Sequence, residues 1–90
     1  MKWENYGYVV ASKYRRKVVL ALTRGELTPK QIAERTGLYL SHVCSVLTEL
    51  NKRGIVTCLT PNLRRGKVYV LSSEGGEIAL KIKVLDETNT

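Results

Sequence analysis

Two closely spaced helices are predicted between residues 28 and 54, and this pair constrains the fold more than any other feature of the chain. Thr28 is a good helix N-cap, and Pro29 follows it where the first turn of a helix tolerates a missing N–H. Gln31 has the spacing of a capping box, and Gly37 supplies a helix stop because glycine accepts left-handed backbone. A second helix is expected from residue 41, and its apolar face and terminal glycine are Val43, Leu47, Leu50 and Gly54.

A basic β-hairpin is predicted directly after the second helix. Residues 55–59 and 67–71 are apolar and rich in β-branched side chains, which favours two short strands. The segment between them contains turn-forming residues and the adjacent Arg64 and Arg65, followed by Gly66. The order helix, helix, hairpin therefore predicts an α+β domain in which the tip of the hairpin is positively charged.

This order of elements resembles the winged helix-turn-helix regulators of bacteria and archaea, in particular ArsR-like and MarR-like repressors and their small archaeal relatives. The positions that carry the resemblance run without a gap through the turn, the second helix and the start of the hairpin: Gly37, Leu38, Ser41, Val43, Leu47, Leu50, Gly54, Ile55 and Val56. The resemblance covers roughly residues 12–80. It implies a three-helix core, a two-stranded β-hairpin wing and a C-terminal helix, with the second helix of the pair lying in the DNA major groove.

The rest of the chain is expected to complete this single domain of 90 residues. Residues 1–11 form an aromatic-rich N-terminal extension, which is either a short helix or a strand. A helix over residues 13–23, capped by Ser12, has the predicted inward stripe Tyr14, Val18, Ala21 and Leu22. The helix-turn-helix core and wing then occupy residues 12–71.

A last helix is expected over residues 73–85, capped by Ser72 or Ser73 and followed by a polar tail over residues 86–90. Gly75 and Gly76 weaken its first turn. Its apolar stripe is Ile78, Ile82 and Leu85. Together with the aromatic N-terminus, this stripe exceeds what one small core obviously needs, so we expect a homodimer through the terminal segments.

The charge balance indicates a polyanionic partner. Fifteen Lys and Arg against eight Asp and Glu give a net charge of +7 on a globular composition with 43% hydrophobic residues. Cations that neutralise phosphates release condensed counterions, so double-stranded DNA is the expected partner. No stretch approaches the ~20 apolar residues needed to span a bilayer, and the first residues lack the apolar core of a secretory signal. A cytoplasmic location without membrane contact is therefore expected.

The second helix is expected to contact bases with the side opposite its apolar face. Hydroxyl groups reach base edges or phosphates, His42 can donate to guanine acceptors, and Leu40 can touch a thymine methyl group. The helix lacks an arginine to read guanine in a bidentate pair, so specificity would depend on weaker contacts and on DNA shape. The predicted DNA-binding residues are Lys30, Tyr39, Leu40, Ser41, His42, Ser45, Thr48, Arg64, Arg65 and Lys67.

Further cations surround these positions. Arg35 flanks the first helix of the motif, and one or two members of the consecutive run Arg15, Arg16 and Lys17 are expected to face DNA. Lys52 and Arg53, at the end of the second helix, are explained by the helix macrodipole alone.

Catalysis, metal binding and cofactors are not expected. His42 has no carboxylate within one helical turn, and no glycine-rich phosphate loop follows a strand. Cys44 and Cys58 match no zinc-binding spacing. These two residues lie on elements that adjoin in a winged helix, so a Cα separation within ~7 Å would allow oxidation to tie the helix to the wing.

The sequence therefore predicts a homodimeric transcriptional regulator that binds specific double-stranded DNA and represses by blocking promoter access. Two other functions stay open: a winged-helix module for protein interaction in a larger assembly, and a protein that packages DNA without sequence preference. Neither the operator nor a small-molecule effector is indicated by the residues.

Overall fold

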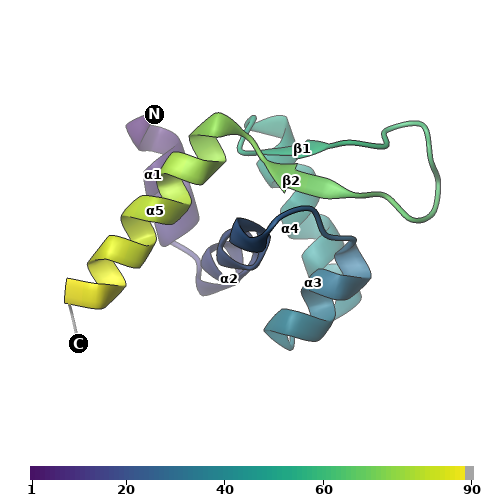
Figure 1. Cartoon of the computed structure of the whole chain (residues 1–90), viewed down its shortest axis with the longest axis horizontal. Coiled ribbons are helices and arrows are strands. Elements are labelled where there is room, and N and C mark those ends of the chain that lie inside the picture. Colours follow the sequence, from purple (N-terminus) through teal and green to yellow (C-terminus); the bar gives the residue numbers. More distant parts are fainter. Residues whose placement is uncertain (89–90) are drawn as a thin grey trace.

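The computed structural model describes residues 1–88 and has the predicted α+β winged helix-turn-helix architecture (Figure 1). The elements in chain order are α1 (Trp3–Val10), α2 (Lys13–Ala21), the 3-10 helix η1 (Leu22–Arg24), α3 (Pro29–Thr36), α4 (Leu40–Lys52), β1 (Val56–Cys58), β2 (Tyr69–Leu71) and α5 (Ser73–Thr88). In Figure 1, α2 lies between the pair α1 and α5 on one side and the pair α3 and α4 on the other, and the hairpin projects away from α5.

The predicted helix pair is confirmed, with both boundaries of its first helix as expected. Both hydrogen bonds of the capping box form: the Gln31 amide donates to Thr28 Oγ1 at 3.2 Å, and the Thr28 amide donates to Gln31 Oε1 at 2.9 Å. Gly37 ends α3 in the left-handed conformation with φ +76°. Helix α4 begins at Leu40, one residue earlier than expected, because Tyr39 already has the extended backbone of an N-cap.

The wing is a short antiparallel hairpin. Its register pairs Val56 with Leu71 and Cys58 with Tyr69, so the regular strands are shorter than the five-residue runs predicted from the sequence. Backbone pairing continues beyond β1, where the Leu59 amide donates to the Val68 carbonyl at 2.8 Å. The segment before α3 joins the sheet through Leu27, whose amide and carbonyl both bond to Tyr69. The hairpin is therefore anchored beside the start of α3.

One apolar core connects all the helices. Its buried members are Val9, Val18, Val19, Leu22, Leu27, Ile32, Val43, Leu47, Leu50, Ile55, Val56, Ile78, Ala79 and Ile82. The stripe predicted for α4 is confirmed, with Val43, Leu47 and Leu50 fully buried. The stripe predicted for α2 is confirmed at Val18 and Leu22 and wrong at Tyr14, which is 40% exposed; Val19, outside the predicted stripe, is buried as well.

The structure settles the form of the N-terminal extension and corrects the predicted ends of α2 and α5. The N-terminal extension, left open between helix and strand, is the helix α1. Helix α2 ends at Ala21 and not at Thr23, because the chain tightens into η1. Helix α5 continues to Thr88, so the predicted helix end at residue 85 is wrong, and residues 89–90 of the predicted tail lie outside the described part. Ile78 and Ile82 belong to the core of the chain itself and are not spare surface for a partner.

A polar network ties α1 to the ends of α4 and α5. The buried Asn5 donates to the Arg53 carbonyl at 3.2 Å and to Glu74 Oε1 at 2.9 Å, and accepts from Arg53 Nη1 at 3.3 Å. The guanidinium groups of Arg15 and Arg53 lie 3.7 and 3.6 Å from the ring centroid of Tyr8. Hydrogen bonds from the Lys2 amide and the Asn5 side chain hold the pKa of the Glu74 carboxyl below its usual value. Arg53 therefore does more than complement the macrodipole of α4.

The first turn of α5 lies against the backbone between α4 and β1. Ser72 caps the helix, as its hydroxyl accepts from the Gly75 amide at 3.1 Å and lies 2.7 and 2.9 Å from the Gly54 and Ile55 carbonyl oxygens. A Cβ atom placed on Gly75 would be 2.1 Å from the Ile55 carbonyl oxygen. Glycine is required here by this close approach and not by an unusual φ.

Replacement of Gly75 therefore tests the fold directly. Gly75→Ala is expected to lower the free energy of unfolding by about 1–3 kcal/mol, because the backbone of Ile55 must move to admit the methyl group. Gly76→Ala is the matched control: nothing lies within 4 Å of its Cβ position, so it should raise stability by about 0.5–1 kcal/mol. Urea unfolding of both variants measures the difference. Equal stability of the two variants would contradict the described contact.

Candidate nucleic-acid interface

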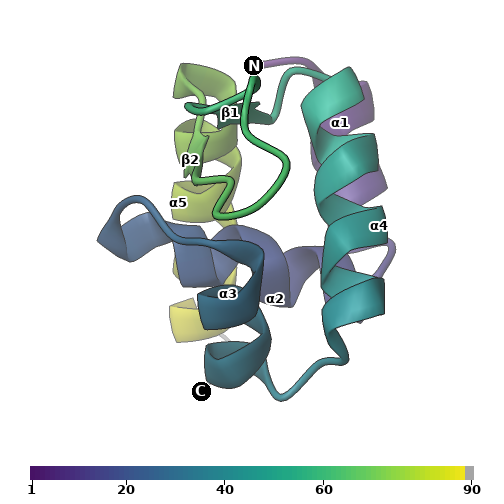
Figure 2. The same ribbon diagram turned by 90° about the vertical axis from the view of Figure 1, so that its right-hand side faces the viewer.

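A groove of about 740 Å³ lies between the start of α3, helix α4 and the tip of the wing. Figure 2 faces this side of the molecule, with α3 below the hairpin loop and α4 to the right of it. Six of the ten predicted DNA-binding residues line the groove: Lys30, Leu40, Thr48, Arg64, Arg65 and Lys67. The fold thus brings together residues that are up to 37 positions apart, from 30 to 67.

Helix α4 presents two adjoining surfaces at this groove. Leu40, Cys44 and Thr48 are four residues apart, so they form a row along the wall that faces the wing. Ser41 and Ser45 are exposed and lie next to this row, on the side opposite the buried stripe. These side chains are short and uncharged, which leaves the backbone of α4 accessible to a close partner. Tyr39, at the N-cap, is 83% exposed and adjoins the same end of the helix.

His42 lies apart from the groove. Its ring stacks on Tyr14 of α2, with centroids 4.5 Å apart and planes inclined by 35°. The sequence had predicted Tyr14 as a core residue, so this neighbour of the interface was missed. No local pattern could have revealed it, because Tyr14 and Val18 have the spacing of an inward stripe while the contact partner is 28 positions away, from 14 to 42.

The cations of the groove form no salt bridge with any residue that the structure describes. Lys30, Arg64 and Arg65 are exposed and Lys67 is half-buried. The salt bridges found in the described part of the chain are elsewhere, between the amino terminus and Glu77 and between Lys52 and Glu49. The groove therefore has a concentrated positive potential that an anionic partner can neutralise.

The consecutive cations of α2 have different roles. Arg15 donates to the Tyr8 carbonyl at 2.7 Å, and Arg16 donates to the Val10 carbonyl, so both groups bind the end of α1. Only Lys17 of this run is an exposed residue, and it lines a separate hollow with Arg24 and Arg35. Of these three residues, Lys17 is therefore the one for which the expected contact with DNA remains a prediction.

One free thiol and a phenol line the groove, and a second thiol lies next to the phenol on the neighbouring strand. Cys44 is exposed and lines the groove with Tyr69, and the half-buried Cys58 pairs with Tyr69 in the hairpin register. Burial raises the pKa of the Tyr69 hydroxyl, and the neighbouring Cys58 and Cys44 raise it further. The residues that the structure describes contain no group of three or more His, Cys, Asp or Glu side chains that could hold a metal ion.

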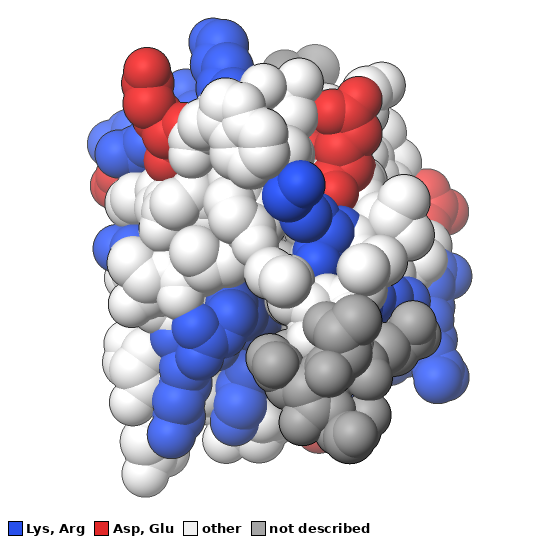
Figure 3. Space-filling model, turned by 90° about the vertical axis from the view of Figure 1, so that its left-hand side faces the viewer, with Lys and Arg blue, Asp and Glu red and all other residues white. Residues whose placement is uncertain are grey.

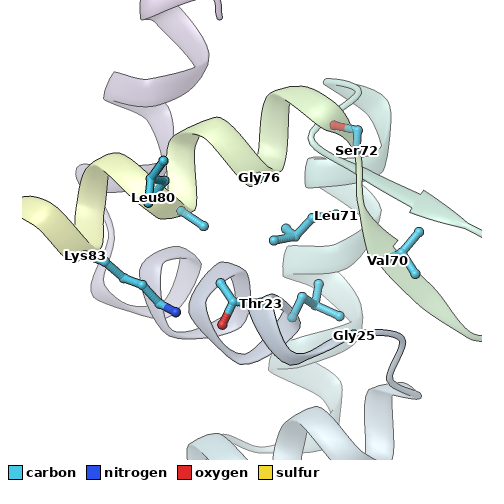
Figure 4. Close-up of a pocket in the computed structure, with 10 residues that line it drawn as sticks. Thr23, Gly25, Val70, Leu71, Ser72, Gly76, Leu80 and Lys83 are labelled. Atoms are coloured by element: carbon cyan, nitrogen blue, oxygen red, sulfur yellow. The ribbon is translucent and has the colours of Figure 1, made fainter.

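A second hollow, of about 380 Å³, lies on another side of the domain between η1, β2 and α5 (Figure 4). Apolar side chains such as Leu22, Leu71 and Leu80 form its walls, and Lys83 lies at its α5 side. Among the described helices, none combines the length and apolar character needed to cross a membrane.

The sequence matches no protein-family model and no curated protein. Solved structures match its fold closely. The homodimeric winged helix-turn-helix DNA-binding domain of Mb0332 from Mycobacterium bovis, a possible ArsR-family regulator, has a TM-score of 0.73 at 26% identity, over 96% of this chain and 80% of the other. TubR from Bacillus thuringiensis serovar israelensis, bound to 24 bp of tubC, has a TM-score of 0.74 at 22% identity, over 90% of each chain.

A MarR family transcriptional regulator from Silicibacter pomeroyi has a TM-score of 0.75 at 20% identity, over 96% of this chain and 59% of the other. The chain spans 53 to 66% of the length of this regulator and of two more matched structures, ZitR from Lactococcus lactis and NadR. The predicted resemblance to ArsR-like and MarR-like winged helix proteins is confirmed at the level of the fold.

The two thiols should differ in reactivity. Cys44 is exposed beside four cations, whereas Cys58 is half-buried against Tyr69, so N-ethylmaleimide should modify Cys44 first. Intact-mass spectrometry over time is expected to show one fast addition that Cys44→Ser abolishes and Cys58→Ser preserves. Persistence of the fast addition in Cys44→Ser would show that the groove does not expose this helix face.

Proposed function

We propose that this protein is a transcriptional regulator that binds specific double-stranded DNA sequences as a homodimer and represses by occupying promoter DNA. The observation that carries the proposal is the groove itself, in which four cations without salt-bridge partners in the described chain flank the exposed face of α4. DNA supplies the phosphates for these cations and a major groove of the width that admits one helix.

Each element has a distinct part in this proposal. Helix α4 reads base edges through Ser41 and Ser45, whose hydroxyls donate or accept, and through Thr48, whose hydroxyl donates to the Cys44 carbonyl at 2.9 Å and accepts from a base. Lys30 lies in the first turn of α3, where its charge and the positive end of the helix dipole attract the same phosphate. Arg64 and Arg65 reach the flanking backbone or a narrow minor groove, whose negative potential favours arginine.

The matched structures support this assignment. TubR was solved bound to DNA, and the Mb0332 domain is described as a homodimeric DNA-binding domain. The location that fits such a regulator is the cytoplasm, and the proposal assigns the chain no catalytic activity, cofactor or known effector. Binding without sequence preference is the second candidate, since the net charge is +7 and α4 carries no arginine.

The homodimer is proposed to form through the face built by α1 and α5. Trp3 of α1, with Lys81 of α5 over its ring, exposes 64% of its surface, and Leu80 of α5, which also borders the hollow beside η1 and β2, exposes 65%. Figure 3 views this side and shows uncharged residues interspersed with Lys and Arg groups, one of them near the centre, and with Asp and Glu groups in the upper part. A two-fold contact on this side directs both α4 helices away from the interface, towards half-sites about 34 Å apart.

Selection from a randomised duplex library tests the DNA proposal. The wild type should enrich one palindromic motif, and Arg64→Ala with Arg65→Ala should lower the slope of log affinity against log salt by about 2, because two phosphate contacts are lost. Arg24→Ala with Lys83→Ala is the control, since it removes the same charge outside the groove and should leave affinity for the selected motif near the wild-type value.

The outcomes separate the functions. Retention without enrichment would replace the specific regulator by a DNA-packaging protein. Absence of retention at low salt would overturn DNA binding in favour of a protein-interaction module.

A charge placed on the terminal face tests the dimer. Leu80→Glu should convert the dimer to a monomer in sedimentation velocity, because a carboxylate would be buried in the contact without a partner. Leu59→Glu is the matched control, as Leu59 is also an exposed leucine, at 49%, but lies on the hairpin. A wild-type chain that sediments as a monomer at all concentrations would contradict the proposed assembly.

A further inference from the structure

A pair of stacked rings extends the surface of α4 on the side away from the wing. Tyr14 lies in the first turn of α2 and stacks on His42 at 4.5 Å between centroids. At 100° per residue, His42 points away from the row formed by Leu40 and Cys44. The two rings therefore form an edge of the interface that the groove does not include.

The exposure of Tyr14 is not explained by packing of the core. The residue is 40% exposed, whereas Val18 and Val19 of the same helix are fully buried. Tyrosine presents a rigid apolar body with few rotatable bonds, together with a hydroxyl that donates hydrogen bonds. Such a side chain can fix a neighbouring ring and still reach a polar partner.

The charges around this edge favour a phosphate. Lys13 adjoins Tyr14 in sequence, and Lys17 lies one turn further along the same helix face; both are exposed, and α2 contains no acidic residue. The acidic side chain of α4, Glu49, lies two turns beyond His42 and pairs with Lys52 at 3.6 Å. No carboxylate of either helix therefore opposes an anion beside the two rings.

We propose that Tyr14 is a positioning residue for DNA recognition, which fixes the imidazole of His42 at a base edge and donates its own hydroxyl to the adjacent phosphate. The inference rests on the proposed DNA-binding function and adds α2 to the interface. Holding the imidazole in one orientation before binding reduces the entropy lost on association. The start of α2 then contacts the DNA backbone beside α4.

Four variants test this role on the duplex that the wild type selects: Tyr14→Ala, Tyr14→Phe, His42→Ala and the double alanine variant. If the pair acts as a unit, the double variant should bind about two- to tenfold more tightly than independent effects of the two single variants would give. Tyr14→Phe keeps the ring and should preserve the coupling to His42 while losing the phosphate contact.

Base preference distinguishes positioning from a purely structural role. Tyr14→Ala and His42→Ala are expected to relax the selected motif at the same positions of each half-site, although Tyr14 touches no base. Without DNA, the ring-proton NMR shifts of His42 should change in Tyr14→Ala and remain near the wild-type values in Tyr14→Phe, because the phenyl ring preserves the stack.

Each contrary result has a defined meaning. Wild-type affinity and motif in Tyr14→Ala, independent effects of the two alanines, or unchanged His42 shifts would overturn the inference and leave the proposed function standing. A wild-type chain that retains no duplex would overturn the proposed function and, with it, this inference.

Discussion

The contact between the first turn of α5 and the peptide that follows α4 fixes the groove beside α4 relative to the face formed by α1 and α5. Gly75 approaches the Ile55 carbonyl so closely that a methyl group would lie 2.1 Å from the oxygen. The Ser72 hydroxyl caps α5 and lies within hydrogen-bonding distance of the Gly54 and Ile55 carbonyl oxygens. Asn5 and Arg53 add α1 to the same junction. In the proposed dimer, the end of α4 is thus fixed relative to the face that sets the half-site spacing.

The distribution of charge and apolar surface follows from this arrangement. Cations of the wing and of α3 gather around α4. By contrast, the guanidinium groups of Arg15 and Arg53 pack on the ring of Tyr8 within the domain. The net charge of +7 therefore overstates the number of groups available to DNA. Exposed apolar side chains lie both at the start of α4 and on the hairpin, as Tyr39 and Leu59 do, and on α1 and α5, where a second copy is proposed to cover Trp3 and Leu80.

Local signals in the sequence predicted the helix pair and the wing correctly, because a capping box, a left-handed glycine and a β-branched hairpin depend on near neighbours. The terminal helices were harder. Helix α1 stayed ambiguous because Gly7 interrupts its aromatic residues, and its buried Asn5 is satisfied by partners 48 and 69 positions away. Tyr14 was assigned to the core because its spacing to Val18 fits a helical stripe, whereas its packing is decided by α4. Six of the predicted contact residues line one groove. Their contact with DNA is proposed from the charge and shape of that groove and does not follow from the fold alone.

The most direct test of the account is NMR titration of the isotope-labelled protein with its selected duplex. The account predicts that backbone amide shifts change most over residues 28–30, 39–48 and 64–67, with a further set at the start of α2, while the amides of α5 change little. Changes confined to α1 and α5, or none along α4 and the wing, would contradict it.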